Sequence, residues 1–227
     1  MGSHADLMAV LAPEPDVAQT DVDALAGLAG TVLDLGLVTR ACLHPDGSTP
    51  ESDTTHTVML SVLVLKVAER WYPHLDPGRL AVLALVHDMV EAICGDVNTW
   101  DLDEAGWAAK AAREAEALDE LRRRHATSRW LLDSVEEYET LSSAEARLVK
   151  SVDKILPSLT SLLGGGETHR RLVSSWREAA EVWLAVNWKL ATTYGAEFRE
   201  VIVLHQMICG RLGPLIDAGP PDTPGAS

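Results

Sequence analysis

Apolar positions recur every three to four residues along most of the chain, which is the spacing of amphipathic helices. This pattern predicts helices at about 16–36, 56–71, 77–94, 103–125, 128–139, 142–163, 167–194 and 196–213. Alternation with a period of two, which is typical of half-buried strands, is nearly absent. The pattern therefore predicts an all-α fold, a helical bundle with additional helices at its C-terminal end.

Breaks in the pattern suggest how the chain is organised. Residues 39–55 are rich in Pro, Gly, Ser and Asp and predict a loop, while Gly164–Gly166 predicts a hinge between helices. Residues 1–15 are expected to be a flexible lead-in, whose first four residues resemble the remnant of a tag. Residues 218–227, rich in Pro and Gly, are expected to be disordered. Residues 16–217 would then form a single domain.

Composition narrows the choice of partners. The 227 residues are 47% hydrophobic, which is enough for a substantial core, and the net charge is −15. That charge argues against a nucleic-acid polymer or an anionic membrane surface as partner. A small anionic substrate stays compatible with it, because a bound divalent cation makes the local field positive. No apolar run approaches the ~18 residues that a membrane span needs.

Cysteine usage and the N-terminus bear on location. The three cysteines, Cys42, Cys94 and Cys209, are far apart and form no CxxC pair. They are expected to be free thiols in a reducing compartment. No basic region followed by a long apolar one opens the chain, so we expect no secretory signal. These features together predict a cytoplasmic protein.

The segment Leu85–Glu91 concentrates ionisable groups on an otherwise apolar predicted helix. His87 and Asp88 are adjacent, and Glu91 follows one turn later on the same side. Such groups are costly to bury unless a metal or a counter-ion pairs them. The arrangement suggests two metal ligands with a carboxylate near a water molecule.

Two further residues have the chemistry to complete such a site. His56 stands at the start of an apolar run, and Asp153 lies within another apolar-periodic helix. Two imidazoles and two carboxylates suit Mn²⁺, Co²⁺, Fe²⁺, Ni²⁺ or, less tightly, Mg²⁺.

The order His, then His-Asp, then Asp on three predicted helices resembles the HD-domain metal-dependent phosphohydrolases, and more narrowly their 5′-deoxynucleotidase branch. The resemblance covers roughly residues 33–163. It rests on Glu51–His56, Ala84–Asp96, Glu136–Glu139 and Leu148–Lys154, with Arg40 placed 16 residues before His56.

The resemblance implies a role for each site residue. His56, His87, Asp88 and Asp153 would bind one divalent metal ion. Glu91 would act as the general base for water, and Asp96 would hold a sugar hydroxyl or extend a proton path. Arg40 would bind phosphate oxygens, and Lys154 would add positive charge nearby.

Three departures from the branch leave the base and the sugar open. Ala41 follows Arg40 where the branch often has an aromatic residue, and Thr55 replaces the usual acid before the first histidine. The linker Cys42–Pro50 is also altered in length.

Each residue has a structural alternative when taken alone. His56 can be a surface or capping histidine, and His87–Asp88 a structural hydrogen-bonded pair. Asp153 can form a helix-face ion pair with Lys154, and Asp96 can cap the next helix. Arg40 is as compatible with a solvated loop as with phosphate binding. The four ligand candidates in the right order favour the metal site.

Other polar and aromatic residues are assigned structural roles. His125, among arginines, is expected at a solvated helix end, and four further histidines have no partner at ligand spacing: His44, His74, His169 and His205. Trp176, Trp183 and Trp188 are expected to pack the core or a subunit interface. The last long helices are the candidates for homodimer formation.

These residues suggest a phosphomonoesterase that hydrolyses nucleoside 5′-monophosphates, deoxy or modified ones included. The alternative is an HD-domain hydrolase of nucleoside di- or triphosphates or of phosphodiesters. A dinuclear oxygenase would need several histidines between Asp88 and Asp153, and His125 is the only one there. A non-catalytic nucleotide-binding module is the alternative of another class, and the intact set of ionisable residues argues against it.

Overall fold

The computed structural model describes residues 16–97 and 102–218 and is built almost entirely of helices. Its elements are α2 (Gln19–Leu37), β1 (Thr39–Leu43), β2 (Pro50–Ser52), α3 (Asp53–Trp71), α4 (Pro77–Val86), α5 (Glu91–Cys94), α6 (Glu104–Arg124), α7 (Arg129–Thr140), α8 (Ala144–Asp153), α9 (Leu156–Leu163), α10 (Glu167–Leu172), α11 (Trp176–Tyr194) and α12 (Arg199–Asp217). The all-α prediction is confirmed.

The predicted loop at 39–55 is the main departure, because it contains an antiparallel hairpin of β1 and β2. The Asp46 side chain accepts hydrogen bonds from the backbone N–H groups of Ser48 and Thr49, which holds the turn. Gly47 has a φ of 71° there, a conformation that glycine adopts without strain. The hairpin ends at Ser52, whose hydroxyl caps the start of α3 by accepting from the Thr55 N–H.

Three predicted helices are each divided in two. The helix expected at 77–94 ends at Val86, and a turn precedes α5. The helix expected at 142–163 breaks after Asp153, and the next segment starts at Leu156 with Pro157 in its first turn, where proline is favoured. The helix expected at 167–194 breaks at Val173, which is extended, before Ser175 caps α11.

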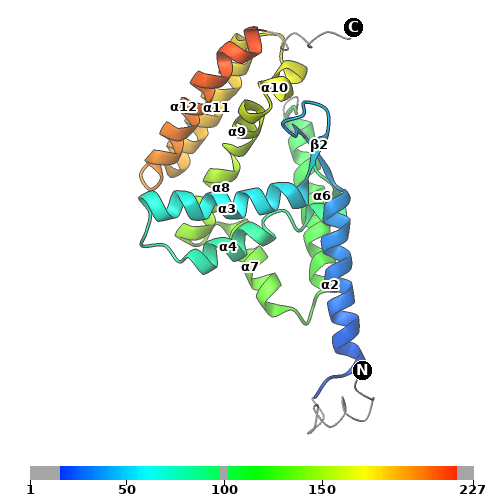
Figure 1. The fold of residues 1–227 in the computed structure, drawn as a ribbon. Helices are drawn as coiled ribbons and strands as arrows, with labels where there is room; N and C mark the ends of the chain where they lie inside the picture. Colours follow the sequence, from blue (N-terminus) through cyan, green and yellow to red (C-terminus); the bar gives the residue numbers. More distant parts are fainter. Residues whose placement is uncertain (1–15, 98–101, 219–227) are drawn as a thin grey trace, which may run out of the picture.

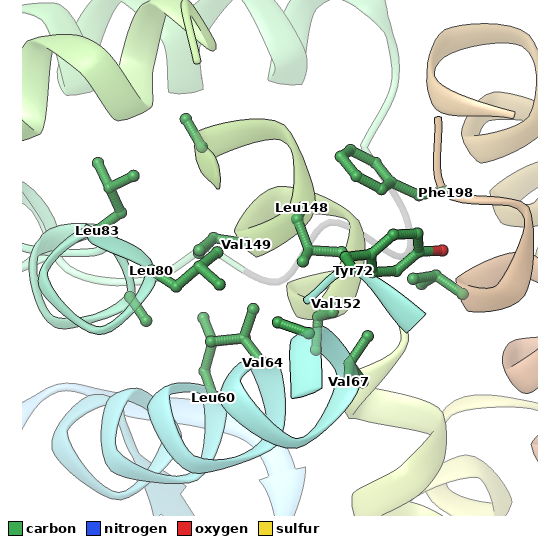
Figure 2. Close-up of a cluster of buried hydrophobic side chains, with 14 of the residues drawn as sticks. Leu60, Val64, Val67, Tyr72, Leu80, Leu83, Leu148, Val149, Val152 and Phe198 are labelled. Carbon is green, nitrogen blue, oxygen red and sulfur yellow. The ribbon is translucent and has the colours of Figure 1, made fainter. Parts of the chain in front are cut away.

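The main core lies between α3, α4 and α8 (Figure 2). Leu60 and Val64 of α3 meet Leu80 of α4 and Val149 of α8, and all four are fully buried. This packing fixes the three helices that carry the predicted metal ligands, so their separation is set by apolar contacts.

A second cluster joins α2 to α6, α7 and the segment around α5. Within it His125 is 4% exposed, and its Nε2 lies 2.8 Å from the Thr31 hydroxyl. The prediction of a solvated helix end for His125 is therefore wrong. The arginines beside it face solvent, but its own ring turns inward towards α2.

The C-terminal helices form a third cluster. In Figure 1, α11 and α12 lie side by side, on the side of the molecule away from α2 and α6. Trp183 packs inside this cluster, while Trp176 and Trp188 are 43% and 73% exposed. Gly164–Gly166 forms the turn before α10, with positive φ at its last two residues. Its role as a hinge stays a prediction.

Several predictions fall wholly or partly outside the described residues. The flexible lead-in at 1–15 lies outside them, as does the predicted disordered tail beyond residue 218. The single domain at 16–217 stays a prediction. Among the described helices, none combines the length and the apolar character that crossing a bilayer requires.

Candidate active site

The end of α4 explains how two consecutive residues point to one place. α4 stops at Val86, His87 is its C-cap, and residues 87–90 form a turn. His87 keeps helical backbone angles, with φ −58° and ψ −36°, so the two side chains still leave the backbone about 100° apart and converge through their outer atoms. His87 Nε2 and Asp88 Oδ2 lie 2.7 Å apart. The prediction of one continuous helix at this point was wrong.

His87 is held in the form that a metal ligand needs. Its ring is 3% exposed, and Nδ1 donates to the carbonyl oxygen of Ala84 at 2.8 Å. A neutral ring that donates from Nδ1 has its lone pair on Nε2. Among the described residues, the neighbour of that buried Nε2 is the Asp88 carboxylate at 2.7 Å, and the contact lacks the geometry of a hydrogen bond. Histidine ligands are oriented in this way by a backbone carbonyl on their other nitrogen.

His56 reaches the same place from the first turn of α3. It is 1% exposed, its Nε2 lies 3.1 Å from Asp153 Oδ1, and its Nδ1 lies 3.7 Å from Glu51 Oε2. Burial alone would lower the pKa of His56, but the two carboxylates outweigh it and raise the pKa to about 9. The ring is thus surrounded by negative charge.

Asp153 closes the set as the last residue of α8. Burial favours the neutral acid, yet Lys154, whose Nζ lies 3.1 Å from Oδ2, and His56 hold the pKa of Asp153 well below its usual range. Donor atoms of His56, His87 and Asp88 lie within 4.8 Å of one another, and Asp153 adjoins them through His56. The structure brings all four predicted ligands together.

Arg40 lies on β1 beside these ligands. Its Nη1 is 2.9 Å from both Asp53 Oδ1 and Asp88 Oδ2, and its side chain is 15% exposed. Arg40 is therefore not a solvated loop residue. Although burial opposes it, the surrounding carboxylates, Asp88 first, raise the pKa of Arg40 further above its normal value.

Glu91 begins α5 and is 7% exposed. Burial, followed by the charges of Asp88 and Asp53, raises the pKa of Glu91 to about 10. Asp96, partly exposed just after α5, is close enough to contribute to that increase. A cation among these carboxylates would stabilise the ionised form of Glu91 and lower its pKa.

The buried polar atoms test whether a cation fits. In the described part of the chain, buried oxygens without a hydrogen-bond partner include one carboxylate oxygen each of Glu51, Asp53 and Glu91. Polar atoms that are buried unpaired destabilise a fold by about 1–3 kcal/mol each. Nitrogen and oxygen donors in this number and proximity fit a divalent cation.

Four polar residues around the site carried no predicted role. Glu51 and Asp53 are 2% and 0% exposed, and two acids so close to His56 were a usable signal. Tyr138 packs edge-on against His87 with ring centroids 5.8 Å apart. Lys150 lies over the Tyr138 ring, its Nζ 4.9 Å from the centroid. Both residues lie within segments on which the family resemblance rests, Glu136–Glu139 and Leu148–Lys154.

The fold and the site define a class of protein: an all-α domain with two histidines and two aspartates grouped as a buried metal-binding site would require. The chain belongs to the HD domain family, whose model matches residues 34–182, about two-thirds of its length. The match contains all four predicted ligands.

Curated relatives match a little under half of the chain. The chain is 38% identical over 107 residues to the 5′-deoxynucleotidase HDDC2 of Bos taurus, which is 46% of this chain and 50% of that one. It is 36% identical over 107 residues to the Homo sapiens protein of the same name, again 46% of this chain and 50% of the relative. The chain spans about half the length of the curated relatives it matches.

Solved structures agree on the fold. A predicted metal-dependent phosphohydrolase from Magnetospirillum magnetotacticum MS-1 is 23% identical with a TM-score of 0.65, over 85% of this chain and 97% of that chain. A conserved hypothetical protein from Pyrococcus furiosus is 22% identical with a TM-score of 0.54, over 81% of this chain and 99% of that chain. The fold therefore has solved counterparts over most of the chain.

Proposed function

We propose that this protein is a metal-dependent phosphomonoesterase that hydrolyses nucleoside 5′-monophosphates, deoxy or modified ones included, to nucleoside and phosphate. The observation that carries the proposal is the convergence of His56, His87, Asp88 and Asp153, with His87 Nε2 only 2.7 Å from Asp88 Oδ2. The relatives named 5′-deoxynucleotidases support the choice of substrate.

These four residues would hold one divalent cation, of which Mn²⁺, Co²⁺, Fe²⁺, Ni²⁺ and Mg²⁺ suit the donor set. When bound, the cation would polarise the phosphoryl group and lower the pKa of a nearby water. Four protein ligands leave room in an octahedral shell for water and a phosphate oxygen.

Glu91 would take the proton from that water. Its carboxylate lies in the cluster with Asp88 and Asp53, at the edge of the donor set. Its pKa of about 10 keeps it protonated in the metal-free protein. It becomes a base when a cation offsets the charges of its neighbours, so base and metal act together. Asp96, just beyond, would extend the proton path or hold a sugar hydroxyl.

Arg40 and Lys154 would bind the phosphate. Arg40 contacts Asp53 and Asp88 through Nη1, and its Nε and Nη2 donors suit phosphate oxygens. Lys154 has a side chain 45% exposed and pairs with Asp153, so its charge faces the same region. Two cationic side chains and a divalent ion would make the local field favourable to an anion, even though the whole chain carries a net charge of −15.

Three further features belong to the proposal. The net charge of −15 opposes binding to a nucleic-acid polymer. The three cysteines are free thiols, which supports a cytoplasmic location. The exposed tryptophans of α11 support a homodimer.

The test is phosphate release from a nucleotide panel. Chelator-treated protein is supplied with Mn²⁺, Co²⁺ or Mg²⁺ and assayed against ribo- and deoxynucleoside mono-, di- and triphosphates of each base. We expect phosphate from monophosphates only with a cation present. Pyrophosphate or tripolyphosphate as product would replace this proposal with a di- or triphosphate hydrolase. No release with any cation would contradict it.

A further inference from the structure

The outer face of α11 and α12 is unusually apolar for an exposed surface. Leu184 and Trp188 of α11 are 68% and 73% exposed, and Met207 of α12 is 65% exposed. Trp176 of α11 and Val203 of α12 are also exposed, at 43% and 44%. Soluble monomers rarely expose contiguous apolar patches larger than a few hundred Å².

This face is hollowed by a groove between the two helices. Its volume is about 640 Å³, and it is lined mainly by Trp176, Ala180, Trp183, Leu184, Gly210 and Gly213. The candidate active site is built on β1, α3, α5, α8 and the end of α4, so the groove belongs to a different region. Small residues on both helices, Ala180 on α11 and the two glycines on α12, make it deep enough for a large side chain.

The sequence of α11 indicates what fills the groove. One ridge of this helix, in steps of four residues, reads Trp176, Ala180, Leu184, Trp188 and Thr192. Each tryptophan on this ridge has a smaller residue at the same distance on the other side of Leu184. Ala180 and Trp188 each lie four residues from it, and Trp176 and Thr192 each lie eight. Ridges of this kind pack against one another where two helices cross.

We propose that two copies of this chain form a two-fold dimer through α11, with Leu184 on the axis and the partner's Trp188 seated in the groove over Ala180. The proposal rests on the homodimer put forward above and names its surface. An antiparallel crossing at Leu184 places each tryptophan of the ridge opposite a small residue, Ala180 or Thr192. An axis midway between Ala180 and Leu184 would instead set Trp176 against the partner's Trp188.

A polar pair at the rim fits the same register. Glu181 and Asn187 each lie three residues from Leu184, so the axis brings them opposite each other. The Oδ1 atom of Asn187 already accepts a hydrogen bond from His205 Nδ1 at 3.0 Å. The amide N–H groups of Asn187 are therefore directed to other acceptors, and the partner's Glu181 carboxylate is a suitable one.

The exposed tryptophans supply part of the area that a dimer interface needs. A tryptophan side chain offers about 150–250 Å², so Trp176 and Trp188 together expose on the order of 200 Å² at 43% and 73%. Leu184, Val203 and Met207 add to this on the same face. A stable interface needs about 800 Å² on each partner, with a buried aromatic anchor near its centre. Trp188 is that anchor.

The first experiment measures mass by sedimentation equilibrium for the full chain and for W188A, with W107A as the matched control. Trp107 lies on α6 and is 47% exposed, away from α11. We expect a dimer for the unsubstituted chain and for W107A, and a dimer dissociation constant at least about 30-fold higher for W188A. A monomeric unsubstituted chain would overturn both this interface and the homodimer.

The second experiment tests the register with single cysteines and a short bifunctional thiol reagent. A cysteine in L184C meets its own copy on the axis and should link two chains efficiently. In R177C the two cysteines would be about 21 Å apart, at 1.5 Å per residue along antiparallel helices. A dimer that links no better through L184C than through R177C would overturn the proposed axis. Phosphate release is measured on the same samples, and its absence would bear only on the proposed hydrolysis.

Discussion

The candidate site and the C-terminal helices each bury two histidines, and the two pairs differ in what surrounds them. His56 and His87 are 1% and 3% exposed, and His169 and His205 are 1% exposed each. The first pair lies among carboxylates. In the second pair, His169 Nε2 accepts from Trp183 Nε1 at 3.1 Å. His205 lies between Ser158 and Asn187, 3.0 Å from each.

The surroundings have opposite electrostatic effects. Burial, with few charges nearby, lowers the pKa of both His169 and His205 to about 4. The carboxylates beside His56 overcome the same burial and raise its pKa to about 9. Burial therefore does not distinguish a functional histidine from a structural one in this protein. The difference lies in whether the second partner is an acid or a neutral group.

The largest expected difference between the two regions is the effect of a substitution on metal binding. We expect H87A and D153A to bind no stoichiometric divalent cation and to lose turnover by at least about 100-fold, since each removes a ligand. H205A, which removes a buried histidine of the other region, should retain the ion. Bound metal is measured by elemental analysis after dialysis against Mn²⁺. An undiminished ion in H87A or D153A would contradict the assignment of ligands.

Glu91 sharpens the comparison within the site. E91Q keeps the size of the side chain but cannot accept the proton, so turnover should fall by about 10²–10⁴-fold. Because Glu91 is not among the four ligands, bound metal should stay stoichiometric. E116Q, on the exposed face of α6, is the matched control and should retain activity. Full turnover in E91Q would exclude Glu91 as the base.

Protonation of His205 in the C-terminal region should make the stability of the protein depend on pH. The unfolded-state pKa of histidine is ≈ 6.5, and folding lowers that of His205 to about 4. The unfolded chain then binds more protons, so this stabilisation is complete above about pH 6.5 and is lost as pH falls towards 4. The loss is on the order of 3 kcal/mol for one histidine.

Urea unfolding of the chain and of H205N between pH 7 and pH 4.5 measures this effect. H205N cannot take up the proton, so its stability should decline less steeply over that range. Equal slopes for the two proteins would show that His205 does not titrate as its surroundings indicate.

The smallest effect concerns a histidine outside both regions. In T31V the hydroxyl beside His125 is replaced by a methyl group of similar size. One nitrogen of His125 then stays buried without its partner, which costs about 1–3 kcal/mol. Thermal unfolding should show the decrease, while bound metal and phosphate release stay unchanged. A loss of metal in T31V would mean that α2 and α6 support the site directly.

Much of the site was accessible to sequence analysis because its residues interrupt apolar helices. His56, His87, Asp88 and Asp153 stand out against their neighbours, and the structure brings them together. Asp53 was missed even though it is fully buried, because its contact with Arg40 depends on the hairpin. The hairpin itself has short strands without clear alternation. No local sequence pattern predicts this hairpin.

The helix breaks were missed for a related reason. Apolar periodicity continues across 87–90 and across 154–155, because residues on both sides pack into the same cores. Periodicity reports which positions are buried and not whether the backbone between them is continuous. The inward turn of His125 likewise depends on a partner, Thr31, that is distant in sequence.

The turn at the end of α4 has a consequence for how a cation would be captured. Because His87 and Asp88 are consecutive and their donor atoms are 2.7 Å apart, an ion that meets one already has the other within reach. Such chelation by neighbours costs little extra ordering of the chain, as the second attachment is intramolecular. Release of the ion would then require the loss of both of these contacts, with α3 and α8 contributing the more distant ligands.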